Sequence, residues 1–121
     1  MIIAIPVSDG SLDSMVDPRF GRAKNFLLYD TDSGAHECIE NLQNLSAAQG
    51  AGIQSASLLV NRGAKALIAP NVGPKAHAVL AKAGVRIFSP GEGDLTARQA
   101  IERYAGGNLH ELTEANVEGH W

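Results

Sequence analysis

The sequence predicts an α/β domain built on a five-stranded mixed sheet with helices on both faces. Two apolar runs, Ile2–Val7 and Ala66–Ala69, contain no polar side chain, which is typical of central strands that are buried on both faces. The turn Thr31–Gly34 separates two further strands, which predicts a hairpin. After residue 42, helical and strand patterns alternate, as they do in parallel βα units with right-handed crossovers.

The first half of the chain contains three expected strands. They are Ile2–Val7, Phe26–Asp30 and Ala35–Asn41. The loop Ser8–Asp17, which follows the first strand, is rich in turn-forming residues and long for a simple connection. Long loops in compact domains are often functional, so we expect this one to contribute to a site.

The second half of the chain carries three expected helices, each with a start signal and a stop signal. Gly50–Gly52 leads into a helix that ends at Gly63, and a capping box at Ser46–Gln49 allows a start as early as Ala47. The other segments are a helix from Gly73 to about Ala83 with Pro74 in its first position, a strand at Val85–Phe88, and a helix at Asp94–Ala105 with a capping box at Thr96–Gln99. We therefore expect a single domain over residues 1–107 and a polar, flexible C-terminal tail over residues 108–121.

Bulk composition narrows the classes of function. The chain has 121 residues and a net charge of −3, which argues against a general binder of nucleic acid or of membrane surfaces. Its single cysteine permits no internal disulfide, and the N-terminal residues lack the basic region of a signal peptide. We therefore expect a cytoplasmic protein.

Five short motifs follow one another along nearly the whole chain. They are Ile3-Ala-Ile-Pro-Val7, Asp17-Pro-Arg-Phe-Gly-Arg-Ala23, Gly50-Ala-Gly-Ile53, Asn71-Val-Gly-Pro74 and Asn116-Val-Glu-Gly-His120. Together they resemble the dinitrogenase iron–molybdenum cofactor-binding family, in particular its small stand-alone members. The resemblance implies a ribonuclease-H-like three-layer α/β/α fold with strand order 3-2-1-4-5 and strand 2 antiparallel. It also implies carriage or assembly of a molybdenum-containing sulfide cluster, of the Mo–Cu–S or Fe–Mo–S type, without catalysis.

The expected binding site lies where the two central strands end. Their connections leave in opposite directions, and ligands of open α/β sheets bind at such a switch point. A thiometallate cluster is an anion, which backbone N–H groups, cations and close-approaching glycines can hold without a covalent ligand. The candidate residues are Ser8, Asp9, Gly10, Arg19, Arg22, Gly50, Gly52, Asn71, Val72, Gly73 and Lys75. For Arg19 and Arg22, the alternative is a salt bridge to Asp9, Asp13 or Asp17.

Direct metal ligands are harder to identify. Cys38 alternates with His36 and Glu40 on one face of the third strand, but we expect a buried structural cysteine there rather than a ligand. His77 either faces the switch point or lies on the exposed side of its helix. His120 lies in the tail, which either closes over a cluster or is solvated.

Two other functions remain to be distinguished from a cluster carrier. One is an interaction or regulatory module without a cluster, which would use the exposed edge of the third strand. The other is a metal-dependent nuclease, which the absence of carboxylates from Ile2–Val7, Ala66–Ala69 and Val85–Phe88 disfavours. We expect a monomer whose partners are the cluster or its precursor and a recipient or assembly protein.

Overall fold

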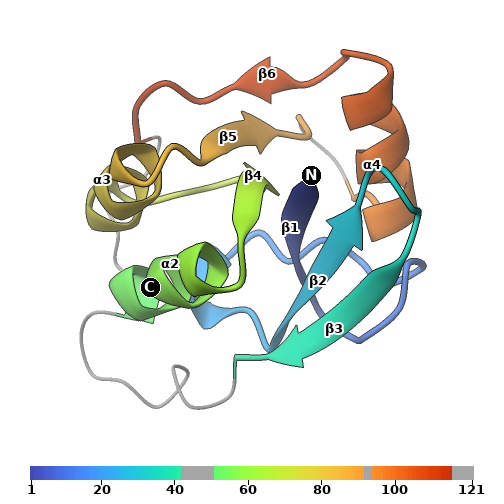
Figure 1. The fold of residues 1–121 in the computed structure, drawn as a ribbon, viewed down its shortest axis with the longest axis horizontal. Coiled ribbons are helices and arrows are strands. Elements are labelled where there is room, and N and C mark those ends of the chain that lie inside the picture. The colour runs from blue at the N-terminus through green and yellow to red at the C-terminus, as the bar shows by residue number, and fades with distance from the viewer. Residues whose placement is uncertain (42–50, 92–93, 116–121) are drawn as a thin grey trace.

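The computed structural model describes residues 1–41, 51–91 and 94–115. Its centre is a six-stranded sheet in the order β3-β2-β1-β4-β5-β6 (Figure 1). The strands are β1 (Ile2–Val7), β2 (Asn25–Asp30), β3 (His36–Glu40), β4 (Ala64–Ile68), β5 (Arg86–Ser89) and β6 (His110–Glu111). The helices are η1 (Phe20–Arg22), α2 (Ala51–Asn61), α3 (Pro74–Lys82) and α4 (Ala97–Ala105).

The predicted order of the first five strands is confirmed, with β2 antiparallel to β1 and to β3, and β1, β4 and β5 mutually parallel. The predicted number of strands is wrong, because β6 adds a sixth strand at the edge. It pairs antiparallel with β5, and the Leu112 N–H donates to the Ile87 carbonyl at 2.7 Å. A two-residue polar strand has no periodicity to detect, and its pairing depends on the open edge of β5. The expected flexible tail is therefore docked at its start, and residues 116–121 lie outside the described part.

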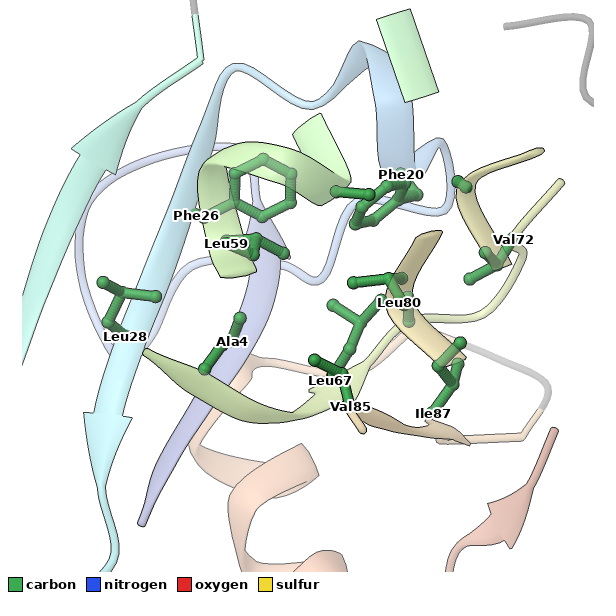
Figure 2. Packing of buried hydrophobic residues seen from close by; sticks show 14 of the residues in the cluster. Ala4, Phe20, Phe26, Leu28, Leu59, Leu67, Val72, Leu80, Val85 and Ile87 are labelled. Atoms are coloured by element: carbon green, nitrogen blue, oxygen red, sulfur yellow. The ribbon is translucent and has the colours of Figure 1, made fainter. Parts of the chain in front are cut away.

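Alternate residues of the central strands face two separate apolar cores, which gives three layers (Figure 1). Figure 2 shows the residues of one of these cores. One core lies under α2 and α3 and the other under α4. The first core contains Ala4, Phe26, Leu28, Leu67 and Ile87 of the sheet, with Leu59 and Leu80 of the helices. The second core contains Ile3, Ile5, Val7, Leu27 and Ile68, with Ala97 and Ala100 of α4.

Local chemistry sets the helix ends. Pro74 occupies the first turn of α3, and Gly63 and Gly84 adopt left-handed conformations, with φ of 82° and 79°, just beyond α2 and α3. The start of α2 predicted from Ser46–Gln49 falls outside the described residues. Among the residues that the structure describes, none of the helices has both the length and the apolar character needed to cross a bilayer.

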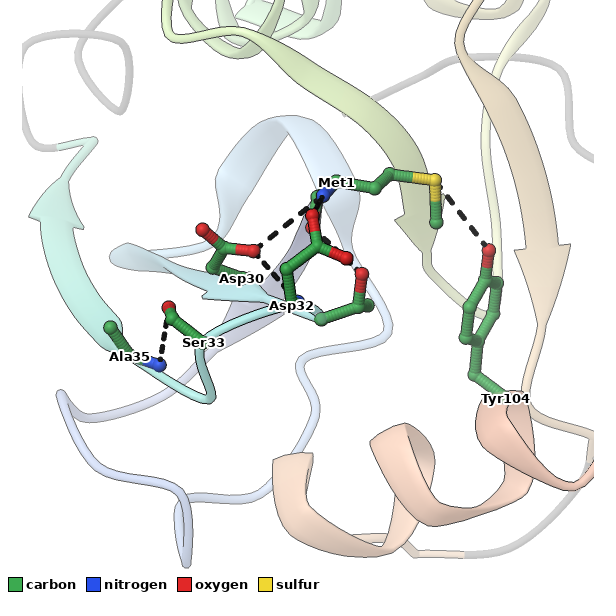
Figure 3. Close-up of polar contacts among 7 residues, drawn as sticks. Met1, Asp30, Asp32, Ser33, Ala35 and Tyr104 are labelled. Carbon is green, nitrogen blue, oxygen red and sulfur yellow. Dashed lines mark hydrogen bonds and ion pairs between the residues drawn. The ribbon is translucent and has the colours of Figure 1, made fainter.

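A group of charged residues lies at the end of the sheet at which β1 begins. The Met1 ammonium lies 2.9 Å from an oxygen of Asp32 and 3.5 Å from one of Asp30 (Figure 3). The hydrogen bond to Asp32 raises the pKa of the ammonium. The backbone N–H of Asp32, together with the ammonium, lowers the pKa of Asp30. These groups satisfy one another at this end of the sheet.

Candidate functional site

β1 and β4 are adjacent parallel strands whose connections leave toward opposite faces of the sheet. After β1, the chain crosses to the α4 side, where Met15 forms an isolated bridge with Thr96. After β4, it passes through Ala69–Gly73 into α3 on the other side. The predicted topological switch point is therefore present, and it is the position at which open α/β sheets bind ligands.

The segment that carries Arg19 and Arg22 is held against this switch point. The Asp17 N–H donates to the Pro6 carbonyl at 2.8 Å, and the Asn71 amide donates to the Pro18 carbonyl at 3.2 Å. Phe20 in η1 is buried in the first core, with its ring centroid 5.4 Å from that of Phe26. The η1 segment and the β4–α3 connection therefore meet at this end of the sheet, as the sequence predicted.

The N-terminus of α3 opens toward the same region. Its N-cap residue is Gly73, which has no side chain to cap the helix, and Pro74 has no N–H. Within the described residues, the N–H groups of Lys75 and Ala76 donate to no protein acceptor. They stand at the positive end of the helix dipole, where an anion is favoured.

The first turn of α2 approaches α3 closely. A Cβ added at Gly52 would lie 3.4 Å from the Cβ of Ala76 in α3. A Cβ at this position would be at the near limit of van der Waals contact, so the two helix starts are closely packed here. Gly52 is thus beside the start of α3 as predicted, whereas Gly50 lies outside the described residues.

Several cations lie on the segments that meet at this end of the sheet. Arg19 Nε lies 3.7 Å from Asp17 Oδ1, so the salt bridge foreseen as the alternative is formed. The Arg19 side chain remains 58% exposed while that of Asp17 is 11% exposed, so the guanidinium keeps donors for a further acceptor. In the part of the chain that the structure describes, Lys24 and Lys75 take part in no ion pair.

A buried polar cluster that sequence reasoning missed supports this region. Asn41 is fully buried, and its amide donates to the Ala23 carbonyl at 2.9 Å. Its backbone N–H donates to the Lys24 carbonyl, and its side-chain oxygen accepts from Ser55 of α2. An asparagine after a strand is an ordinary turn residue in sequence, so no local pattern could have indicated this role.

The start of the long loop is exposed, and its third residue, Gly10, lies toward β3. Ser8, Asp9 and Gly10 are exposed, and a Cβ at Gly10 would lie 3.3 Å from the sulfur of Cys38 in β3. Two strands, β2 and β1, separate β3 from β4 at about 4.8 Å per spacing. Gly10 therefore lies toward the β3 edge of the sheet and is not brought to Asn71, whereas Ser8 directly follows the end of β1.

The predictions for the sulfur and imidazole ligands need correction. Cys38 is exposed, not buried, because it lies on the face of β3 opposite to Ile39, which is the β3 residue that the first core buries. Partial desolvation raises the pKa of its thiol, and Glu40 raises it further, which disfavours the thiolate that metals need. No three His, Cys, Asp or Glu side chains converge on a common point among the described residues.

His77 is half-buried and contacts the chain that follows β6. Its Nε2 lies 3.0 Å from the Leu112 carbonyl, so it ties α3 to the chain that follows β6. Val72 lies in the β4–α3 connection, where it is fully buried and acts as a core residue. His120 is outside the described residues.

Comparison with known proteins decides the family. The family described as "Dinitrogenase iron-molybdenum cofactor" matches residues 1–107. The chain belongs to this family. The resemblance drawn from the five motifs is thereby confirmed, and family membership supports a cofactor-related role.

Two solved structures and one further relative agree with this assignment. The apo form of the orange protein from Desulfovibrio gigas is 38% identical over 96% of each chain, with a TM-score of 0.91. A putative NifB protein from Thermotoga is 40% identical over 98% of each chain, with a TM-score of 0.82. An uncharacterised protein of Methanocaldococcus jannaschii is 33% identical over 90 residues, or 73% of each chain.

Proposed function

We propose that this protein binds and carries an anionic metal–sulfur cluster at the end of the sheet where β1 and β4 diverge. The observation that carries the proposal is the open N-terminus of α3, with two N–H groups that have no acceptor in the described protein. Arg19, Arg22 and Lys75 add positive charge beside it. An anion placed there would gain charge-assisted hydrogen bonds from both backbone and side chains.

Family membership and the likeness to the orange protein favour a molybdenum-containing cluster, of the Mo–Cu–S or Fe–Mo–S type. Such a cluster brings its own sulfide ligands, so cations and amides suffice and no thiolate from the protein is required. This accords with a single cysteine, Cys38, on the far edge of the sheet. We propose a carrier or assembly role, with a cluster-accepting protein as partner.

We propose no catalytic role. A two-metal nuclease holds its ions with carboxylates that project from central strands, and β1, β4 and β5 carry none. We also propose that the fold is of the ribonuclease-H-like type, that the protein is a monomer and that it is located in the cytoplasm. A nuclease assay with Mg²⁺ or Mn²⁺ tests the proposal of no catalytic role, and light scattering tests the monomeric state.

Reconstitution tests the cluster proposal. The purified chain is incubated with tetrathiomolybdate and either Cu⁺ or Fe²⁺, and excess reagent is removed by gel filtration. We expect a visible absorption band that co-elutes with the protein at a constant metal-to-protein ratio. Elution of all molybdenum in the small-molecule fraction, with the protein folded, contradicts the proposal.

A further inference from the structure

Met15 is an exposed methionine on the loop that follows β1. The residue is 40% exposed. The other exposed large apolar residue in the described part of the chain is Met1, at the end of the sheet where β1 begins. There the Met1 sulfur accepts a hydrogen bond from the Tyr104 hydroxyl at 3.9 Å (Figure 3). Among the described residues, no hydrogen bond reaches the sulfur of Met15, so this thioether is available to a ligand.

The segment that contains Met15 pairs with the end of β1. The Met15 carbonyl accepts from the Ser8 N–H at 3.2 Å, and Val16 forms an isolated bridge with Val7, the last residue of β1. β2 pairs with the other edge of β1 as far as Val7, so this segment lies on the edge that faces β4. β4 pairs with β1 along Ile2–Ala4, so the segment takes up the same edge beyond that pairing. Met15 therefore lies where β1 and β4 diverge, which is the switch point.

The direction of the Met15 side chain follows from its neighbours. The side chain of Val16 packs against the second core, on the α4 side of the sheet. Successive side chains of an extended segment point to opposite faces, so Met15 and Asp17 share the face turned away from that core. Asp17 Oδ1 on this face lies 3.7 Å from Nε of Arg19. The thioether of Met15 is therefore on the same face as the ion pair that contains Arg19.

We propose that Met15 forms an apolar, polarisable wall of the cluster site and selects a sulfide-coated anion over an oxyanion of the same charge. The inference rests on the proposed function and specifies the class of guest that this site accepts. The N–H groups at the start of α3 and the Arg19 guanidinium suit anions in general, phosphate included. These donors therefore give affinity for an anion but do not distinguish sulfide from oxide.

The chemistry of a thioether supplies this distinction. A methionine side chain is flexible, apolar and polarisable, so it adapts to an irregular surface and gains dispersion energy from large soft atoms such as sulfur. An oxyanion binds water strongly, and it loses hydrogen bonds when an apolar side chain displaces that water. Sulfide atoms bind water more weakly, so the same contact costs them less. The contact forms no covalent bond and transfers no proton or electron.

The methionine methyl groups test this inference in the unmodified protein, because the sequence contains two methionines. Protein labelled with ¹³C at these methyl groups is titrated with tetrathiomolybdate and, separately, with molybdate, which has the same charge and tetrahedral shape. We expect tetrathiomolybdate to shift the signal of Met15 and to leave that of Met1 unchanged. We also expect it to bind at least about fivefold more tightly than molybdate.

Two substitutions at this exposed residue separate selection from general attraction of anions. Met15→Gln keeps the length of the side chain but replaces the thioether with a polar amide, so the preference for tetrathiomolybdate should fall by about fivefold. Met15→Leu keeps the apolar surface and should restore most of the preference.

The outcomes distinguish this inference from the proposed function. If tetrathiomolybdate binds but the Met15 signal does not move, or if Met15→Gln keeps the native preference, the inference is overturned and the proposed function stands. If the native protein binds neither tetrathiomolybdate nor the reconstituted cluster, both are overturned.

Discussion

The helices α3 and α4 begin in opposite ways, although each follows a connection from a central strand. The first turn of α4 is closed by its own chain: Ala97 N–H donates to the Ser14 carbonyl at 2.9 Å and Arg98 N–H to the Leu12 carbonyl at 2.8 Å. Thr96 and Gln99 complete a reciprocal capping box. At α3, the cap is a glycine, the first residue is a proline, and the next two N–H groups donate to no acceptor in the described chain.

This difference separates a structural helix start from one that is available to a ligand. Carbonyl groups of the loop after β1 accept hydrogen bonds from the first N–H groups of α4. These N–H groups are therefore not available to an anion. The chain after β4 leaves α3 open, and the Asn71–Pro18 hydrogen bond holds the segment that carries Arg19, the N-cap residue of η1, against this chain. Among the described residues, the same fold thus has one helix start with N–H groups that have no protein acceptor and one whose N–H groups are already satisfied.

The largest effect on stability is expected at Phe20, whose buried ring fixes η1 in the first core. Phe20→Ala should lower the free energy of unfolding by about 3–5 kcal/mol, because the ring is 1% exposed and its removal leaves a cavity. Urea denaturation measures this loss. Met15→Ala, at a residue 40% exposed, serves as the control and should stay within about 0.5 kcal/mol. A similar small loss for Phe20→Ala would show that η1 is not fixed by this ring.

Thr96→Ala should remove the cap of α4 and lower the free energy of unfolding by about 1 kcal/mol. Cluster retention after reconstitution should not change, because this helix start is structural. Loss of the cluster in a folded Thr96→Ala variant would place the site at α4 instead.

The opposite change, the addition of a capping side chain at the start of α3, is Gly73→Ser. Its hydroxyl can accept from the free N–H groups of α3 and should change stability by only a few tenths of a kcal/mol. Because the hydroxyl competes with the anion for the same donors, cluster retention should fall. Unchanged retention, with the unfolding free energy confirming a native fold, would remove these N–H groups from the site.

The smallest effect is expected from the ion pairs at the opposite end of the sheet. The Met1 ammonium has its pKa raised above 8.0, so its stabilising contribution is lost as pH rises through the folded value. Asp30 has its pKa lowered below 3.8, so its contribution is lost as pH falls through the folded value. Thermal melting across pH should show a weaker alkaline decline for Asp32→Asn than for the native chain. Identical alkaline curves would mean that this pair does not contribute to stability.

Features determined by neighbouring residues were predictable from the sequence. Pro74 at the first turn of α3 and the Thr96–Gln99 box act over a few residues, and both are confirmed. The order of the first five strands follows from connection rules that act between consecutive elements.

Features determined by distant residues were not predictable. Whether Cys38 is buried depends on what packs over its face of β3, which no local pattern in the sequence records. The pairing of His110–Glu111 depends on the open edge of β5, and the burial of Asn41 depends on Ser55 in α2. The position of Gly10 depends on the path of a ten-residue loop, which has no periodic constraint.

Cluster affinity in two charge-matched double variants tests the central claim most directly. Arg19→Ala with Arg22→Ala removes two positive charges beside the open helix start, and Arg62→Ala with Arg86→Ala removes two at the opposite end of the sheet. Loss of charge-assisted hydrogen bonds predicts at least about tenfold weaker binding of the reconstituted cluster for the first variant and near-native binding for the second. Equal affinity of both variants, each with a native unfolding curve, would contradict the account.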